Sequence, residues 1–412
     1  MRTSRLLLGL FLAAALLCGT YLAGFGTCWL LGRARTQPST AEAQNLGVFW
    51  EAWHLLDDEF LGEKPSAVQR AYGATHGMVA TFNDPYTIFV EPQPRELERD
   101  ELRGEFGGIG AWVGLDEAGH IALTPMKDSP AAQAGIQEGD VVIAVDGQKV
   151  TGMPPEQVVA LIRGPVGSTV RLTLRRAGLA EPLEFEIERQ TIELPTVEYR
   201  LLEQDPQAGY VSIRLIGERT PDELKDALRD LRQQGATRLI LDLRHNPGGA
   251  LLASVDVASQ FLPGSVVLYE QRKDGQEKPY YAARSGLALD WPLAVLVDAA
   301  TASGAEIIAG ALQDHGRAHI IGEQTFGKGS VQNVHDLSDG SSLHVTVARW
   351  LTPHRYQIDG QGLTPDDVVP FTDEDRAAGR DPQLERAIAY LAEQASRGRV
   401  SVGAGLSRGG SQ

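Results

Sequence analysis

Hydrophobic positions follow a helical rhythm in the first part of the chain. Over residues 46–78, apolar side chains recur every three or four positions, which predicts an amphipathic helical segment. The sequence Asn83-Asp84-Pro85-Tyr86 predicts a turn, and the charged stretch 92–103 predicts a further helix. We therefore expect an N-terminal helical region over residues 46–103.

The rhythm changes near Gly104, where short apolar runs separated by turns replace the helical spacing. These runs, which are typical of strands, are residues 121–123, 141–145 and 170–174. Residues 155–162 interrupt them with the apolar spacing of a short helix. A small β domain with helices is expected over residues 104–190.

Strands and helices alternate beyond Gly209, which is typical of an α/β arrangement. A helix over residues 221–234 has Thr220 as its N-cap. Residues 238–243 and 293–297 are continuous apolar runs, as in strands buried on both faces. The predicted fold class is multidomain α+β, with an N-terminal helical segment, a β domain and an α/β core.

The two ends of the chain differ from its body. Residues 6–31 contain no charge and no proline, and they exceed the roughly 20 residues that cross a bilayer. They predict a signal anchor over residues 1–32, with a cleaved signal peptide as the alternative, followed by a polar linker over 33–45. The segment 371–396 is expected to be helical, and the Gly/Ser-rich tail 397–412 disordered.

Composition narrows the functional classes. The net charge is −16, from 54 acidic and 38 basic residues, which argues against a nucleic-acid-binding protein. The two cysteines, Cys18 and Cys28, both lie in the N-terminal apolar segment. The body of the chain therefore has no disulfide, no cysteine-based zinc site and no cysteine nucleophile.

Ser303 lies where an apolar strand meets a helical stretch, in the sequence Thr301-Ala302-Ser303-Gly304-Ala305-Glu306. There, backbone N–H groups and the positive end of the helix could stabilise an oxyanion beside a serine nucleophile. A serine at this position is also a common helix N-cap, a role that needs no catalysis. On this segment alone, both interpretations stay open.

Lys328 lies between two glycines in the sequence Thr325-Phe326-Gly327-Lys328-Gly329-Ser330-Val331-Gln332. A lysine can accept a proton from serine only if burial lowers its pKa, and the flanking glycines allow a close approach to other elements. Gln332 could then fix the ammonium group. The alternative is an ordinary surface lysine.

Two glycine-containing turns could present backbone N–H groups to a substrate. Asn246-Pro247-Gly248-Gly249 follows the buried strand 238–243. The loop Gly107-Gly108-Ile109-Gly110 precedes a strand, and could bind a peptide's terminal carboxylate while the strand accepts the peptide by β-augmentation. In both places a plain turn is the alternative.

No histidine lies in a recognisable triad context; the candidates are His245, His315, His319, His335, His344 and His354. No metal-binding pattern and no phosphate-binding or dinucleotide-binding loop accompanies them. We therefore expect neither a metal nor a cofactor.

Taken in order, these segments resemble the C-terminal processing peptidases, also called carboxyl-terminal or tail-specific proteases. The resemblance covers about residues 46–370. The segments that carry it are 77–87, 107–113 with 129–140, 241–249, 301–303, 326–332 and 363–366.

The resemblance implies roles for individual residues. Ser303 would be the nucleophile, Lys328 the general base and Gln332 the residue that orients it. The oxyanion donors would be the N–H groups of Gly304 and of Gly248 or Gly249. The implied peptide-binding residues are Gly107, Gly108, Ile109, Gly110 and Ala111, together with Arg163, which would couple peptide binding to assembly of the active site.

The resemblance also implies an architecture and a function. A PDZ domain is expected over residues 104–190, and a serine protease core of the ClpP/crotonase-like type over 191–370. The expected protein is a serine endopeptidase that recognises unstructured C-terminal tails and cleaves through an acyl-enzyme. The alternatives are a catalytically silent, membrane-tethered PDZ scaffold and a Ser-His hydrolase on the same fold.

Where the family usually has Ala-Ser-Ala-Ser-Glu, this chain has Ala-Ser-Gly-Ala-Glu at residues 302–306. Gly304 keeps the N–H donor, so an active enzyme is expected. Its partners would be proteins or peptides with exposed C-termini and the membrane that its N-terminal segment enters. The expected location of the catalytic body is the outer side of the bacterial inner membrane. The sequence leaves open whether the chain forms a homodimer.

Overall fold

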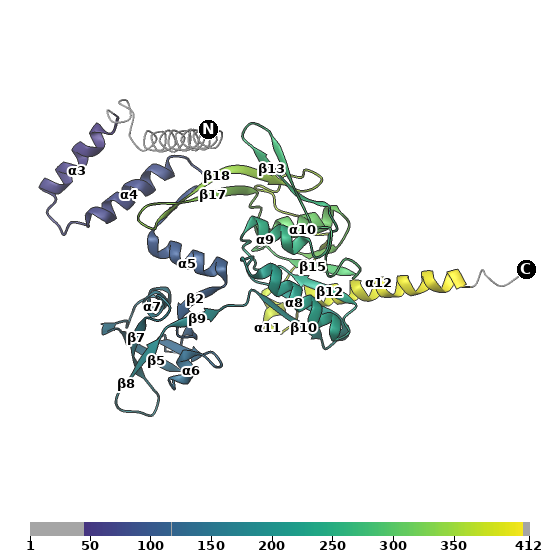
Figure 1. Ribbon diagram of the computed structural model, residues 1–412, viewed down its shortest axis with the longest axis horizontal. Helices are drawn as coiled ribbons and strands as arrows, with labels where there is room; N and C mark the ends of the chain where they lie inside the picture. Colours follow the sequence, from purple (N-terminus) through teal and green to yellow (C-terminus); the bar gives the residue numbers. More distant parts are fainter. Residues whose placement is uncertain (1–44, 117, 407–412) are drawn as a thin grey trace, which may run out of the picture. The chain divides into compact units, whose positions relative to one another are not determined.

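The computed structural model describes residues 45–116 and 118–406, and the chain divides into two compact units, Met1–Ala74 and Thr75–Gln412 (Figure 1). The predicted signal anchor over 1–32 lies outside the described residues, as does the linker up to residue 44. Within the described ranges, no helix combines the length and the apolar character that crossing a bilayer requires.

The first unit contains helix α3 (Gly47–Glu59) and the start of α4 (Ala67–Ala80). In the structure, the helical pattern predicted over 46–78 is divided between these two helices. Pro65 lies in the connection, where its ring and missing N–H are incompatible with a helix interior. On α3, the rings of Phe49 and Trp50 meet edge to face with centroids 5.1 Å apart.

The second unit contains a β domain that closely follows the predicted pattern. Its main sheet has the order β3-β4-β5-β7-β8, with β6 paired to β5, and a two-stranded ribbon joins β2 to β9. The strands are β2 (Glu105–Gly108), β3 (Ala111–Leu115), β4 (Ile121–Pro125), β5 (Asp140–Val145), β6 (Gln148–Lys149), β7 (Thr169–Arg175), β8 (Leu183–Glu188) and β9 (Gln190–Glu193). The helices are α5 (Pro92–Arg103), which leads into the domain, α6 (Pro130–Gln133) and α7 (Pro155–Ile162). The short apolar runs of this region therefore alternate between a buried core and the surface, as a sheet covered on one face requires.

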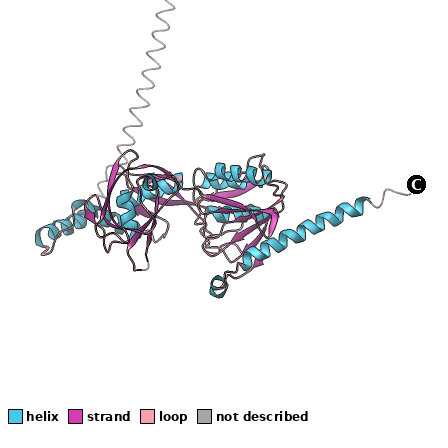
Figure 2. Ribbon diagram, turned by 90° about the horizontal axis from the view of Figure 1, so that it is seen from below, coloured by secondary structure: helices cyan, strands magenta, loops and turns pink. Residues whose placement is uncertain are grey.

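The α/β core contains a six-stranded sheet in the order β10-β11-β12-β15-β16-β19, parallel except for the β10–β11 pair. Its strands are β10 (Val197–Leu202), β11 (Asp205–Ile213), β12 (Arg238–Asp242), β15 (Leu293–Val297), β16 (His319–Gly322) and β19 (Asp367–Val368). Leu239 and Val295 pack with the helices α8 (Thr220–Gln233), α9 (Leu251–Ala258) and α10 (Gly304–Asp314). Ile240 and Ala294, which point to the other face, pack against α12 (Pro382–Leu406), the long helix that leads to the C-terminus in Figure 2. The sheet is therefore covered on both faces, as its continuous apolar strands predict.

A second sheet brings distant segments together beside the α/β core. It has the order β1-β18-β13-β14, and β17 also pairs with β18. These strands are β1 (Ile88–Val90), β13 (Val266–Arg272), β14 (Glu277–Tyr281), β17 (Ser330–Asp336) and β18 (Ser342–Leu351). In the β1–β18 pair, Ile88 lies opposite His344. The segment before the β domain thus completes a sheet of the core.

The C-terminal part differs from the prediction. The segment 371–396 is helical as expected, with α11 (Asp373–Ala377) and the first turns of α12. The predicted disordered tail is wrong up to Leu406, because α12 continues to that residue. A helix that is already formed adds residues more readily than a new one starts, so composition alone is a weak guide there. Residues 407–412 lie outside the described part of the chain.

Candidate active site

The Ser303 segment is a tight turn between β15 and α10. Ser303 has φ 52° and ψ −116°, a strained conformation for a residue with a side chain. Asp298 Oδ1 accepts the backbone N–H groups of Ala300 and Thr301, at 3.0 and 2.9 Å. The Thr301 hydroxyl donates to the carbonyl oxygen of Leu243 at 2.8 Å, which ties the turn to the end of β12. The surrounding hydrogen bonds thus hold Ser303 in a conformation that it would not adopt alone.

Glu306 joins the two predicted catalytic segments. Its Oε2 accepts the backbone N–H of Ser303 at 2.8 Å and that of Lys328 at 2.9 Å. Its Oε1 accepts the N–H of Gly327 at 2.8 Å and the hydroxyl of Thr325. The side chain is fully buried, and burial raises the pKa of Glu306 although these donors act in the opposite direction. One carboxylate therefore fixes the serine and lysine segments against each other.

This role of Glu306 was not among the predictions from the sequence. The only local signal was its position three residues after Ser303, where a helix-capping carboxylate is common. The bonds to Gly327 and Lys328 arise from tertiary structure.

Lys328 is half-buried, and this burial lowers its pKa, partly offset by the negative charge of Glu98. Its Nζ lies 5.1 Å from the ring centroid of Tyr86. Its carbonyl oxygen accepts the indole N–H of Trp350 at 2.9 Å, which anchors the backbone. Lys328 is therefore partly shielded from water, and its role as the base stays a prediction.

Gln332 lies on β17, opposite Thr346 of β18. Its Nε2 donates to Ser330 Oγ at 2.8 Å and to Thr346 Oγ1 at 3.2 Å. Among the described residues, no hydrogen bond joins the side chains of Ser303, Lys328 and Gln332 to one another. The backbone of Lys328 is thus joined to Ser303 through Glu306, while the side chain of Gln332 is held by its own hairpin.

The glycine turn after β12 lies directly against the serine. A Cβ added to Gly248 would be 2.8 Å from Ser303 Cβ, and a Cβ added to Gly304 would be 3.4 Å from the backbone nitrogen of Gly249. The N–H of Gly248 already donates to Asn246 Oδ1 at 2.8 Å. The N–H groups of Gly249 and Gly304 have no acceptor among the described residues. Of the two alternatives, the geometry favours Gly249 as the partner of Gly304.

The histidines of the described region do not contact Ser303. His245, in the strand-to-turn segment before Gly248, pairs with Asp298 through Nδ1 at 2.8 Å and is 75% exposed. His315, His344 and His354 contact Val266 O, Glu98 and Asp314, respectively. Nowhere in the described ranges do three or more metal-ligating side chains form a cluster.

The β domain contains an apolar cavity of about 160 Å³ between the glycine loop with β3 and helix α7. Its lining includes Trp112, Met126, Val159 and Ile162. The backbone N–H groups of Ile109 and Gly110 have no acceptor within the described residues. The predicted peptide-binding loop and strand therefore lie beside a hydrophobic cavity with free donors at its edge.

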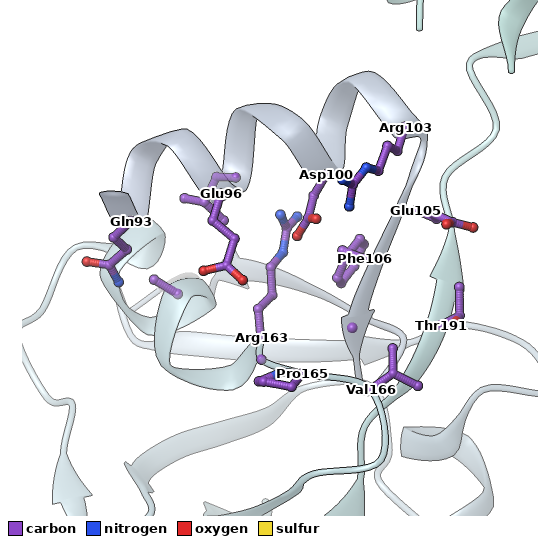
Figure 3. A pocket seen from close by; sticks show the side chains of 14 residues that line it. Gln93, Glu96, Asp100, Arg103, Glu105, Phe106, Arg163, Pro165, Val166 and Thr191 are labelled. Carbon is purple, nitrogen blue, oxygen red and sulfur yellow. The ribbon is translucent and has the colours of Figure 1, made fainter. Parts of the chain in front are cut away.

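Arg163 lines this cavity and also a neighbouring one of about 370 Å³, which lies against α5. Figure 3 shows its side chain extending toward Glu96 and Asp100 of that helix. The guanidinium lies 3.9 Å from the ring centroid of Phe106, and burial lowers its pKa. Within the described residues, no ion pair reaches Arg163, so its predicted coupling role has no contact to the catalytic segments in this structure.

Comparison with known proteins places these features in one family. Residues 207–369 match peptidase family S41, and residues 121–176 match the PDZ domain. The carboxyl-terminal-processing protease of Synechocystis is 36% identical over 321 residues, covering 77% of this chain and 75% of the relative. The carboxy-terminal processing protease CtpB of Bacillus subtilis is 33% identical, covering 80% and 69%.

Solved structures agree on the fold. An S41 protease candidate from Bacteroides fragilis superposes with a TM-score of 0.51 at 17% identity, covering 84% of this chain and 97% of that one. The mixed architecture of a PDZ domain and an S41 protease core is therefore confirmed, as is the resemblance inferred from the sequence motifs.

Proposed function

Because the chain belongs to the carboxyl-terminal-processing proteases of peptidase family S41 and is a serine-type peptidase, we propose that it captures exposed C-terminal tails in its PDZ domain and cleaves them through Ser303 and Lys328. The observation that carries this proposal is the buried Glu306 carboxylate, which binds the backbone N–H groups of both residues. A silent PDZ scaffold would not need a strained serine tied to a desolvated lysine.

The chemistry follows from general base catalysis by a neutral lysine. Lys328 Nζ accepts the Ser303 hydroxyl proton while Oγ bonds to the peptide carbonyl carbon, and the N–H groups of Gly249 and Gly304 stabilise the oxyanion. The ammonium group then protonates the leaving amine as the peptide bond breaks, which leaves an acyl-enzyme. Water, deprotonated by the same amine, hydrolyses the ester and restores Ser303. Because no hydrogen bond joins the two side chains here, they must approach each other when a substrate binds.

Tail capture rests on the glycine loop and the adjacent cavity. The free N–H groups of Ile109 and Gly110 suit a terminal carboxylate, and the cavity beside Trp112 suits an apolar last side chain. A Cβ on Gly110 would lie 2.5 Å from Ser129 Cβ, so the loop conformation depends on glycine at this position. We therefore expect peptides that end in an apolar residue to be preferred.

The decisive experiment is cleavage of a peptide with an apolar C-terminus by purified protein. Ser303→Ala and Lys328→Ala should both abolish cleavage, whereas Lys225→Ala, which removes a lysine from the surface of α8, should leave it unchanged. A scrambled or amidated tail should raise KM. Full activity in Ser303→Ala or Lys328→Ala would contradict the proposed mechanism and leave a different nucleophile or base to be found.

The pH dependence gives a second measurement. Because burial lowers the pKa of Lys328, the amine becomes neutral below the usual value of about 10.4. The rate should rise with pH through that lowered pKa. A cleavage rate that does not change with pH between about 6 and 10 would argue against a lysine base.

The location of the protein is a further proposal. The apolar run over residues 6–31 would anchor the chain in the bacterial inner membrane, with the catalytic body on the outer side. Membrane fractionation and N-terminal sequencing of the mature protein test this. Recovery of a soluble chain that begins after residue 32 would indicate a cleaved signal peptide.

A further inference from the structure

The turn Asp84-Pro85-Tyr86-Thr87, which precedes the PDZ domain in sequence, lies against the catalytic segments. Asp84 organises the turn, since its Oδ1 accepts the N–H of Tyr86 at 3.2 Å and its Oδ2 accepts the hydroxyl of Thr87 at 2.6 Å. Strand β1 begins directly after the turn and pairs with β18. The turn is therefore fixed to the core by backbone pairing rather than held by the PDZ domain.

One side of the turn reaches Gln332 through Thr346. Thr87 Oγ1 accepts the backbone N–H of Thr346 at 3.2 Å. The Thr346 hydroxyl oxygen accepts a hydrogen bond from the Gln332 amide group at 3.2 Å. Hydrogen bonds thus link Gln332 to Thr346, Thr346 to the Thr87 hydroxyl, and that hydroxyl to the carboxylate of Asp84, which favours one orientation of the glutamine amide.

The other side of the turn reaches Lys328. The Lys328 Nζ lies 5.1 Å from the ring centroid of Tyr86, within the distance at which a ring face attracts an ammonium group. Both side chains are half-buried, so water screens this attraction less than at the surface. Burial raises the pKa of the Tyr86 hydroxyl, which keeps the ring neutral beside the lysine.

We propose that the Asp84–Thr87 turn is a third element of the catalytic site, in which Tyr86 positions the Lys328 ammonium group and Asp84 positions Gln332 through Thr87 and Thr346. This inference rests on the proposed function, in which Lys328 is the base. Tyr86 is a positioning residue: its ring stabilises the protonated lysine between turnovers, and so sets the pH at which the free base becomes available.

Other charges also act on Lys328 or on Tyr86. Glu98 on α5 acts on Lys328 itself. The charges of Glu306 on α10, Asp84 in the turn and Asp359 after β18 act on Tyr86, and Asp359 also pairs with Arg349 at 3.8 Å. Replacing Tyr86 by an apolar residue leaves all of them in place. A difference in pH profile between Tyr86→Leu and Tyr86→Phe therefore reports on the aromatic ring alone.

The test is the pH profile of kcat/KM for Tyr86→Leu and Tyr86→Phe. The leucine variant removes the ring face, so the protonated lysine is less stable and the acid limb should move to lower pH by about half a unit, with a fall in kcat larger than the change in KM. The phenylalanine variant keeps the ring face and should match the parent. Tyr281→Leu, at an exposed position on β14, is the matched control.

The outcomes separate the two proposals. An unchanged acid limb in Tyr86→Leu, with Lys328→Ala inactive, would overturn the role of Tyr86 and leave the Ser-Lys mechanism standing. Cleavage by Lys328→Ala would overturn both. If Tyr86→Leu does not fold, as judged by its circular dichroism, Tyr86→Met takes its place with the same expected shift.

Thr346→Val tests the branch to Gln332. It breaks the hydrogen bond between Thr346 and Gln332 while keeping the shape of the side chain. We expect kcat to fall about tenfold with KM unchanged, and the acid limb to stay in place. A variant with parental kcat would show that the Asp84 branch does not position Gln332.

Discussion

The PDZ domain and the protease core differ in how far they depend on buried carboxylates. In the PDZ domain the fully buried side chains are mainly aliphatic, such as Leu172 and Val158, and the buried Asp140 pairs with Arg176 at the edge. In the protease core, buried carboxylates hold loops together: Glu306 joins the serine and lysine segments, and Asp242 binds Arg244 at the end of β12.

This difference follows from what each region must do. A peptide-binding groove works with free backbone donors and an apolar cavity at its surface, which a simple hydrophobic core can support. An active site needs groups fixed within a fraction of an ångström, and satisfied buried hydrogen bonds supply that rigidity. Substitutions in the two regions should therefore separate stability from chemistry.

The largest effect is expected from Glu306→Ala. It would leave four donors without an acceptor inside the core, which should lower the free energy of unfolding by about 3–5 kcal/mol and abolish cleavage. Urea unfolding and the peptide assay measure both. Glu306→Gln, which keeps the size, should lose less stability; parental cleavage by the alanine variant would show that the carboxylate does not assemble the site.

A comparable loss of stability is expected in the PDZ domain from Leu172→Ala, but with different consequences. Leu172 is fully buried, so its truncation should cost about 3 kcal/mol in that domain. Because the protease core does not contain this residue, reaction of Ser303 with a small serine-directed probe should persist. Loss of probe reactivity would show that the two regions unfold together.

The Asp140–Arg176 pair predicts how the PDZ domain responds to acid. Burial favours a higher pKa for Asp140, but hydrogen bonds from Arg176 and from the backbone of Gln137 hold it below the usual value. The pair therefore contributes stability above the unfolded pKa of about 3.9, and this contribution is lost as pH falls through the lower folded value. Asp140→Asn should lower the free energy of unfolding by about 2 kcal/mol at neutral pH. The stability of this variant should also fall less steeply in acid, which thermal unfolding between about pH 7 and 2 would measure.

The smallest effect on stability is expected at the groove. Trp112 is 54% exposed and lines the cavity beside the glycine loop. Trp112→Ala should change the free energy of unfolding by no more than about 0.5 kcal/mol, but raise KM for a tail substrate about tenfold with kcat unchanged. A fall in kcat instead would mean that the groove contributes to chemistry as well as to binding.

Local signals in the sequence predicted the regular elements well. Residues 155–162 form α7 and residues 293–297 form β15 as expected, because apolar spacing and flanking turns fix such segments locally. Strand β17 was missed because its residues beyond Gln332 are exposed and, apart from Val334, polar. Only the pairing with β18 makes them a strand.

The residues of the candidate site could be predicted from the sequence, but the contacts that hold them together could not. Sequence motifs identified Ser303, Lys328 and Gln332 as candidates, and the catalytic roles of these residues stay predictions. The link through Glu306 and the approach of Tyr86 to Lys328 depend on segments that meet only in the folded chain, so no spacing could reveal them.

The pairing of β1 with β18 has a consequence for how the protein is made. Residues 88–90 leave the ribosome long before their partners at 342–344, and the whole PDZ domain is synthesised in between. During that interval β1 is an unpaired edge, while the PDZ domain, with mostly local contacts, can fold first. The core closes last, through a long chain loop, and a fragment cut at residues 191–370 would lack one of its strands.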